Sequence, residues 1–263
     1  MAIPHHARET LTADQAAALL PEVEAHVEKI LARVNRVAPL EPGATGAKPA
    51  VLDMGAGQGL FLLCCSRRGL RAVGIEPWAA ARSAAEQVAR CAGVEISILP
   101  GVAEQLPFGD GEFDFVHANS VIEHVTDPQA VFAEAHRVLK PGGLFWFATA
   151  SSRCPRQHEI AGFPLFGWYP DRLKRRIMQW ARVRRPGLIG GTEFPAVNWF
   201  TPGKARRMLA QAGFTKVYDR WEFRRPQEGG RMYRAALAIV RTLPPVKLLA
   251  DVLIEGCNFA AMK

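Results

Sequence analysis

The pattern of apolar and polar positions from residue 50 onward alternates short apolar runs with segments of helical spacing. Apolar runs bounded by turn residues occur at AVLDM (50–54), RAVGIE (71–76), VEISIL (94–99), FDFVHA (113–118) and LFWFATA (144–150). Such runs are typical of strands that are covered on both faces. Helices are predicted to begin near Gly59, Trp78 and Asp127, and Asp127 can cap the last of them. This alternation predicts βαβ units and a parallel sheet.

An amphipathic helix is predicted before this region. Thr12 and Gln15 have the spacing of a capping box. Apolar residues then recur at three- and four-residue steps, at Leu20, Val23, Val27, Ile30, Leu31 and Val34. Pro21 marks a kink in this helix or its start, and a Gly/Pro-rich stretch over 41–49 ends it. We therefore expect an N-terminal helical cap over 1–45 and a core domain over 46–150.

The alternation stops after residue 150. Residues 151–200 are rich in Arg, Trp, Phe and Pro, and we interpret them as a lid insertion. A helix is predicted from Thr201 and Pro202 to Gly213. Two further strands are expected near 215–223 and 232–241, followed by an apolar tail around 248–253. Residues 201–263 would thus complete the core sheet.

Composition places the chain among globular proteins. Its 263 residues are 49% hydrophobic and 22% charged, which suffices for a large core. No apolar run reaches the roughly 20 residues of a membrane-spanning helix, and residues 1–10 lack the pattern of a secretory signal. The odd number of cysteines without C-x-x-C spacing predicts reduced packing residues. A cytoplasmic enzyme is the expectation.

The net charge of +8 is concentrated in the insertion, where residues 151–187 contain nine basic and two acidic residues. Leu173, Ile177 and Trp180 are predicted to share one face of a helix over 171–183, whereas Lys174, Arg175 and Arg182 lie away from it. Two interpretations stay open. The helix binds an anionic membrane surface with help from the tail at 248–253, or it covers the sheet as a lid with its apolar side buried.

A glycine-rich segment, VLDMGAGQG, carries the strongest local signal. Asp53 closes the first predicted strand, and glycines follow at positions 55, 57 and 59. Glycines let the backbone approach a ligand closely, and the following helix offers free N–H groups. Glu76 ends the second strand, where a carboxylate can accept hydrogen bonds from ribose hydroxyls. Leu60 replaces the third glycine of the dinucleotide fingerprint, which disfavours a nicotinamide cofactor. A tight strand-to-helix turn without a ligand is the alternative.

Several further segments combine with this loop into a family pattern. They are GIEP, AEQLPFGDGEFDFV, SVIEHVTDPQAVFAEAHRVLKPGG and FTPGKARRMLAQAGF. Over 50–150 and 200–214 the chain resembles the class I S-adenosylmethionine-dependent methyltransferases, in the small-molecule branch with the ubiquinone- and menaquinone-pathway enzymes. The resemblance implies an α/β fold: a Rossmann-like, doubly wound, seven-stranded sheet with an antiparallel last strand, plus a lid insertion. It also implies S-adenosyl-L-methionine as cofactor.

The resemblance further implies a role for each matching residue. Gly55, Gly57 and Gly59 would run beneath the methionine part, Asp53 would hold the loop and the amino group, and Glu76 would bind the ribose. The remaining cofactor contacts would be Pro77 against the adenine, Ala103 and Glu104 along its edge, and Asn119 and Ser120 near the sulfonium. Val102 stands where relatives often carry an acidic residue, so adenine recognition would depend more on backbone contacts.

Two histidines are candidates for catalysis. Methyl transfer from a sulfonium needs mainly positioning and exclusion of water, but a hydroxyl acceptor also needs a base. We expect His124 or His158 to serve, with a structural role for His124 and an idle surface position for His158 as alternatives. In ubiquinone O-methyltransferases a related stretch binds a magnesium-like ion; Glu123 and His124 match it, but Ser120 replaces a ligating carboxylate, so no metal is expected.

Aromatic residues of the insertion are the candidate walls of an acceptor pocket, namely Phe163, Trp168, Tyr169 and Trp199. Such walls suit a flat or lipophilic molecule. We therefore expect a methyltransferase for a small acceptor, with O-methylation favoured over C- or N-methylation. The alternatives are an RNA methyltransferase of the same fold, although nucleic acid is not the expected partner, and a non-catalytic binding protein that retains the fold. The oligomeric state cannot be predicted.

Overall fold

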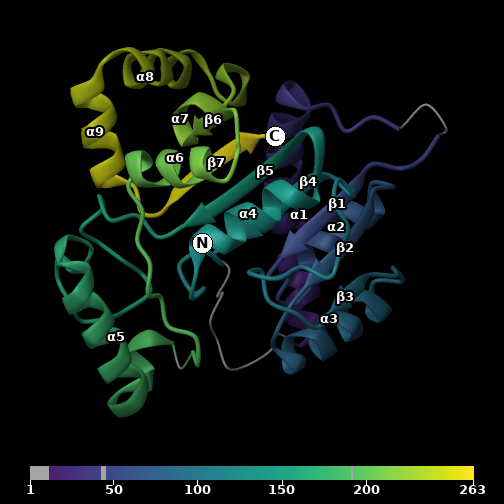
Figure 1. Cartoon of the computed structure of the whole chain (residues 1–263), viewed down its shortest axis with the longest axis horizontal. Helices are drawn as coiled ribbons and strands as arrows, with labels where there is room; N and C mark the ends of the chain where they lie inside the picture. The colour runs from purple at the N-terminus through teal and green to yellow at the C-terminus, as the bar shows by residue number, and fades with distance from the viewer. Residues whose placement is uncertain (1–11, 43–45, 191) are drawn as a thin grey trace.

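The computed structural model describes residues 12–42, 46–190 and 192–263. Its centre is a seven-stranded sheet with the order β3-β2-β1-β4-β5-β7-β6 (Figure 1). The strands are β1 Ala50–Met54, β2 Arg71–Ile75, β3 Ser97–Leu99, β4 Phe113–Asn119, β5 Leu139–Thr149, β6 Lys216–Asp219 and β7 Cys257–Met262. β1 to β5 pair in parallel, whereas β7 runs antiparallel to both β5 and β6. The predicted doubly wound sheet with an antiparallel last strand is confirmed.

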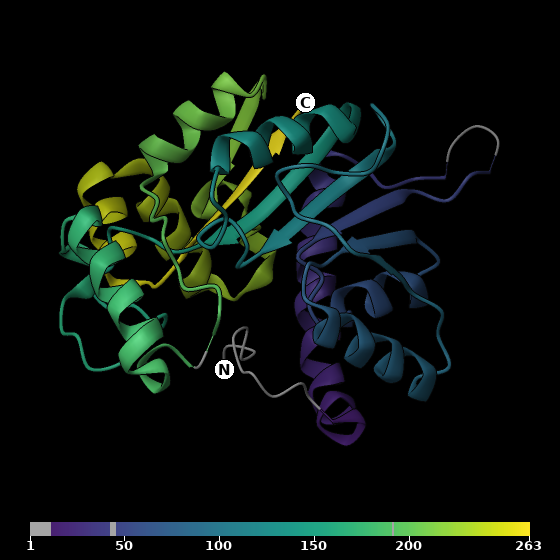
Figure 2. The same ribbon diagram turned by 60° about the horizontal axis from the view of Figure 1, so that its bottom comes forward.

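Helices cover both faces of this sheet. They are α1 Ala13–Val37, α2 Leu60–Arg67, α3 Ala79–Cys91, α4 Pro128–Val138, α5 Asp171–Arg184, α6 Pro202–Gln211, α7 Arg220–Phe223, α8 Arg231–Thr242 and α9 Pro244–Leu253. Because side chains alternate along a strand, Val51 joins a cluster with α1, α2 and α3, whereas Leu52 joins one with α4 and α6. Figure 2 shows the purple and blue helices below the sheet and α4 and α6 above it.

The predicted helix starts agree with the structure. Thr12 and Gln15 form the capping box of α1, which continues through Pro21 without a break. The Asp127 carboxylate accepts hydrogen bonds from two backbone N–H groups of α4, and the Thr201 hydroxyl accepts one from the Lys204 N–H of α6. These side chains satisfy N–H groups that have no partner inside the helix. The predictions for residues 1–10, and part of that for 41–49, lie outside the described residues.

The prediction for the C-terminal part was wrong in its details. β6 ends at Asp219, and residues 231–242 form α8 rather than a strand. Residues 244–253 form α9, and the last strand is β7, Cys257–Met262. The physical reason is that β7 pairs with both β5 and β6 and fills the position between them. The Ala-rich segment 231–242 satisfies its backbone hydrogen bonds as a surface helix instead.

The insertion has an apolar core of its own. This lid core contains Ala150, Ile160, Phe166, Met178, Ala181, Ile189, Ala196 and Trp199. Of the two interpretations of α5, the one that buries its apolar side was wrong, because Leu173 and Trp180 are 44% and 47% exposed while Lys174 is fully buried. The Lys174 ammonium lies 4.3 Å from the Trp199 ring centroid and 2.8 Å from an Asp171 oxygen. These contacts compensate the buried charge, so the lysine side of the helix can face inward.

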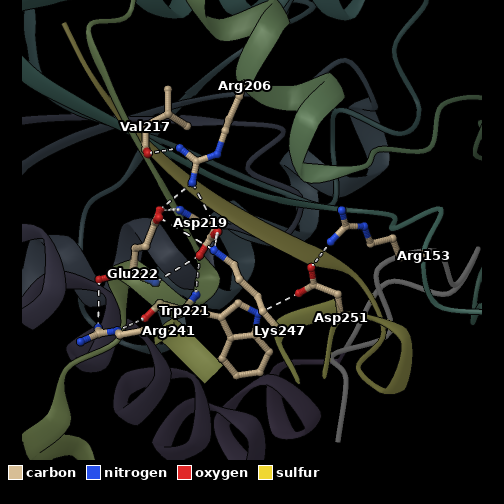
Figure 3. Close-up of polar contacts among 9 residues, drawn as sticks. All are labelled: Arg153, Arg206, Val217, Asp219, Trp221, Glu222, Arg241, Lys247 and Asp251. Carbon is tan, nitrogen blue, oxygen red and sulfur yellow. Dashed lines mark hydrogen bonds and ion pairs between the residues drawn. The ribbon is translucent and has the colours of Figure 1, made fainter. Parts of the chain in front are cut away.

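A polar network connects the lid to the C-terminal helices (Figure 3). Asp251 of α9 accepts a hydrogen bond from Trp221 Nε1 at 2.7 Å and forms an ion pair with Arg153 at 2.5 Å. Lys247, one turn earlier on α9, pairs with Asp219 at the end of β6. The start of the lid is thereby fastened to the segment between β6 and β7.

Two further sequence predictions can be compared with the structure. All five cysteines are free; Cys64, Cys65, Cys154 and Cys257 are buried as expected, whereas Cys91 is exposed. Over the described ranges, no helix is both long enough and apolar enough to cross a membrane.

Candidate cofactor and acceptor site

The glycine loop connects β1 to α2 at the carboxyl edge of the sheet. Gly55, Gly57 and Gly59 all have positive φ, but their surroundings differ. A Cβ on Gly55 would collide with Val121, and one on Gly59 would lie 2.7 Å from Ile96 Cδ1, so packing alone requires glycine at both positions. A Cβ on Gly57 would meet nothing within 4 Å. Gly57 is therefore where the loop backbone is open to a ligand.

Glu76 is held against this open part of the loop. Its two carboxylate oxygens accept hydrogen bonds from the backbone N–H groups of Gly57, at 2.9 Å, and Trp78, at 3.0 Å. Burial raises the pKa of Glu76, although these two hydrogen bonds act in the opposite direction. Each oxygen of a carboxylate can accept a second hydrogen bond, so the group can also bind vicinal hydroxyls. The predicted ribose contact is compatible with this geometry.

An apolar surface lies next to the loop. Leu99 at the end of β3 and Val102 after it are 37% and 47% exposed, and Pro77 is exposed as well. Ala103 is buried, and Glu104 accepts a hydrogen bond from the Thr126 backbone at 2.9 Å. Glu104 thus also holds the turn that follows β4. The open glycine, the fixed carboxylate and the exposed apolar side chains together fit an adenosine group.

Asp53 has a partner that the sequence did not indicate. Its carboxylate is 2.7 Å from Nδ1 of His117 on β4, and both side chains are buried. The His117 ring is stacked between Phe61 of α2 and Trp146 of β5. Its centroid lies 3.8 Å from the Phe61 ring centroid and 4.9 Å from that of Trp146. The sequence missed His117 because it lies inside an apolar run and its partner is 64 positions away. No local signal could have found it.

The end of β4 has an unusual backbone. Ser120 follows Asn119 with a φ of 56°, in the left-handed region that residues other than glycine rarely adopt. Its N–H donates to the Ala148 carbonyl of β5 at 3.0 Å, which holds this conformation. The chain then places Val121 against Gly55. Such strain is often found at functional sites, and here it brings Val121 to the glycine loop, while the contacts of Asn119 and Ser120 with the cofactor stay a prediction.

The turn after β4 carries Glu123 and His124 and is fastened to the lid. The Glu123 carbonyl accepts hydrogen bonds from the N–H groups of Val197, at 2.7 Å, and Asn198, at 3.1 Å. The Asn198 side chain also donates to the carbonyls of Ile122 and Val125. His124 is half-buried in this turn. The returning segment of the lid therefore fixes the position of both candidate residues.

The Glu123 carboxyl group is itself buried. It accepts a hydrogen bond from the Thr149 hydroxyl at 2.8 Å, at the end of β5. Burial, with a smaller contribution from the Glu159 carboxylate, raises the pKa of Glu123 to about 8. Glu123 is therefore mainly protonated at neutral pH. From the sequence, Glu123 was noted only because it matches a residue of the metal-binding stretch in ubiquinone O-methyltransferases, and its burial was not predicted.

His158 lies in a different environment. Its Nδ1 is 2.6 Å from a carboxylate oxygen of Glu255, and its side chain is 57% exposed. Glu255 belongs to the segment before β7, not to the glycine loop. The structure thus pairs His158 with a carboxylate near the surface, and its role as a base stays a prediction. In the described part of the chain, no group of three or more His, Cys, Asp or Glu residues is arranged to hold a metal ion.

The four aromatic candidates for the acceptor pocket are not equivalent. Trp199 is only 1% exposed and packs edge-on against Phe166 inside the lid core. Trp168 is 55% exposed, and its indole N–H donates to the Arg153 carbonyl. Phe163 and Tyr169 are half-buried at the edge of the lid core. Trp199 therefore shapes the lid from within, and only the other three present accessible surface.

The sheet order, the antiparallel β7 and the open glycine loop beside a buried carboxylate define a class I methyltransferase architecture. Residues 52–147 match the methyltransferase domain family, so this part of the chain is a methyltransferase domain. The methyltransferase family predicted from the sequence is thereby confirmed for this domain.

Comparison with known proteins gives the same result. An uncharacterized methyltransferase of Synechocystis is 36% identical over 41% of this chain and 50% of its own length. A ubiquinone biosynthesis O-methyltransferase of Maricaulis maris is 33% identical over 59% of this chain and 64% of its own length. The chain thus spans about half the length of the curated relatives it matches.

Solved structures show the same fold. The geranyl diphosphate C-methyltransferase of Streptomyces coelicolor, solved with Mg²⁺, geranyl diphosphate and S-adenosylhomocysteine, aligns with a TM-score of 0.57. The alignment covers 95% of this chain and 83% of the other, at 18% sequence identity. At this identity the likeness establishes the fold alone.

Proposed function

We propose that the chain transfers the methyl group of S-adenosylmethionine to a small lipophilic or aromatic acceptor, with a hydroxyl oxygen as the favoured methyl-accepting atom. The observation that supports a cofactor at this site is the open backbone of Gly57 beside the Glu76 carboxylate. The preference for oxygen is supported by the O-methyltransferases among the partial relatives, at 33% to 37% identity.

The bound cofactor supplies a methyl group on a positively charged sulfur, which is a good leaving group. The residues of the chain have to bind the cofactor and the acceptor, orient them toward each other and exclude water from the site. Glu76 and the backbone of the glycine loop hold the ribose and the methionine part, Pro77 and Val102 offer apolar surface to the adenine, and Asp53 supports the loop. The lid over 151–200, which we propose as a separate unit, closes the acceptor side.

A hydroxyl acceptor must lose its proton during the transfer. We propose His124 as the group that accepts it, because its turn is fixed between the glycine loop and the lid. His158 would have to leave Glu255 to reach an acceptor, so it is the second choice. Phe163, Trp168 and Tyr169 would contact the acceptor, and Trp199 would shape the lid around it.

We propose in addition that the outer face of α5 contacts an anionic membrane. At 100° per residue, exposed Leu173, Trp180 and Val183 fall within one sector of the helix, together with exposed Arg172, Arg176 and Arg184. Apolar side chains interleaved with arginines suit an interface of acyl chains and anionic headgroups. Figure 1 places α5 at the edge of the molecule, away from the sheet. A membrane-bound position would give access to a lipophilic acceptor.

Vesicle co-sedimentation tests the membrane contact. Binding to vesicles with anionic lipid should be lost on changing Arg172, Arg176 and Arg184 to Glu, and should be weak on neutral vesicles. Arg207→Glu is the matched control, because it changes an exposed charge on α6, outside the lid. Equal binding by the triple variant and the control would refute the proposal.

The methyltransferase activity is tested with labelled cofactor. The protein should bind S-adenosylhomocysteine in calorimetry and transfer the label to one member of a panel of phenolic and prenylated acceptors. Transfer only to RNA would favour the RNA methyltransferase alternative. Absence of cofactor binding would favour the non-catalytic binding protein and refute the proposal.

A further inference from the structure

His117 stands in a row of residues that crosses the sheet directly below the glycine loop. In the strand registers Asp53 of β1 is aligned with His117 of β4, and His117 with Trp146 of β5. Gly74 of β2 is aligned with Asp53 on the other side and contributes no side chain. Aligned residues of neighbouring strands point to the same face and are in contact. The carboxylate of Asp53 therefore has the His117 ring as its lateral neighbour.

The orientation of this ring is fixed by its neighbours. Phe61 and Trp146 lie on its two sides with interplanar angles of 4° and 3°, and all three rings are at least nine-tenths buried. Rotation about the ring bond would bring its edge into one of these aromatic planes. The direction of Nδ1 is thus set by packing. In this direction the Nδ1–H of His117 can donate a hydrogen bond to the Asp53 carboxylate oxygen, which lies 2.7 Å away.

A buried carboxylate without a fixed donor would choose among several rotamers and partners. Asp53 is two residues before Gly55, at the point where the chain leaves the sheet to form the loop. Its direction therefore affects the part of the site that receives the methionine end of the cofactor. Phe115, two residues before His117 on the same face, shares the aromatic cluster but has no polar contact with Asp53.

We propose that His117 is a positioning residue of the cofactor site: clamped between Phe61 and Trp146, it holds Asp53 in the direction that receives the amino group of the cofactor. The proposal rests on the proposed cofactor binding and adds a residue that does not itself touch the cofactor. If the proposal is correct, the hydrogen-bond donor at Nδ1 is needed and a side chain of similar volume cannot replace it. Loss of this donor should weaken binding of the methionine end of the cofactor and leave binding of the nucleoside unchanged.

The experiment compares two ligands on three variants. S-adenosylhomocysteine carries the amino group, whereas 5′-methylthioadenosine lacks the amino acid portion and keeps the nucleoside. His117→Leu removes the donor and keeps an apolar side chain. His117→Asn keeps a donor close to the position of Nδ1. Phe115→Leu is the matched control for loss of packing in the same cluster.

The expected result is a selective loss of affinity, measured by calorimetry. His117→Leu should weaken S-adenosylhomocysteine binding about tenfold or more, the size of a charge-assisted hydrogen bond, and leave methylthioadenosine binding within about twofold. His117→Asn should restore most of the affinity, although it packs less well. Phe115→Leu should lower the thermal midpoint without changing the ratio of the two affinities.

Three results would overturn the proposal. They are unchanged S-adenosylhomocysteine affinity in the Leu variant, an equal loss for both ligands, and an Asn variant no better than Leu. If the unaltered protein binds neither ligand, the proposed function fails as well. If it binds both and the Leu variant behaves like it, only the role of His117 fails. Thermal melts of each variant show whether a lost affinity reflects unfolding.

Discussion

Replacing Glu123 by Gln should stabilise the protein at neutral pH and leave its stability unchanged in acid. Glu123 is buried after β4, and its carboxyl group accepts a hydrogen bond from the Thr149 hydroxyl. Gln has the same shape and keeps an oxygen for that hydroxyl. It cannot ionise, so it removes the cost of placing a negative charge in this site.

The magnitude follows from the pKa of about 8, compared with an ordinary value of 4.5. Below pH 4.5 the carboxyl is protonated in both the native and the unfolded state, and its ionisation costs nothing. Between 4.5 and 8 only the unfolded chain ionises, so native stability falls by about 1.4 kcal/mol for each pH unit. The cost at pH 7 is therefore on the order of 3 kcal/mol. Above pH 8 both states are ionised and the cost stays constant.

Urea unfolding at several pH values from 4.5 to 9 measures this difference. The gain in unfolding free energy of Glu123→Gln over the unaltered protein should grow from near zero at pH 4.5 and level off above pH 8. Glu134→Gln is the control of opposite sign, because hydrogen bonds from Arg137, opposed by burial and assisted by Leu106, lower the pKa of Glu134. Its replacement should destabilise most near neutral pH, and less as the pH falls below 4.5. A constant difference between Glu123→Gln and the unaltered protein at all pH values would show that Glu123 ionises normally in the native state.

Three further changes test other parts of the site and fold. Glu76→Ala should weaken S-adenosylhomocysteine binding about tenfold or more in calorimetry with an unchanged circular dichroism spectrum, and unchanged affinity would remove Glu76 from the site. His124→Ala should abolish methyl transfer while cofactor affinity stays, whereas near-normal turnover would make His124 structural. Asp219→Asn should destabilise the chain by about 1 to 3 kcal/mol, measured by urea unfolding at pH 7. Burial opposes ionisation of Asp219, but the Lys247 hydrogen bond and the helix-capping N–H groups outweigh burial and lower the pKa of Asp219. The stabilisation by ionised Asp219 is therefore present above pH 3.8 and lost as the pH falls. Equal losses of stability in Asp219→Asn at pH 7 and pH 3 would contradict this reasoning.

The first part of the fold followed from local signals. The apolar runs at 50–54, 71–76 and 113–118 are strands, and Asp127 and Thr201 begin helices, because these signals act through contacts a few residues apart. The glycine loop and Glu76 were predictable for the same reason. The segment at 231–242 was not, because its apolar residues fit either period and the competing strand lies further along the chain.

The sequence alone determined the strands and helices up to residue 150, the family and the glycine loop, since each depends on residue types at fixed short spacings. Only the tertiary structure decided which side of α5 is buried, because Lys174 needs Trp199 and Asp171 to lie inside. It also decided the pairing of Asp53 with His117 and the burial of Glu123, which bring together residues from different strands and from the lid. Contacts between positions far apart in the chain set hydrogen-bond partners, burial and pKa, and no spacing in the sequence specifies them.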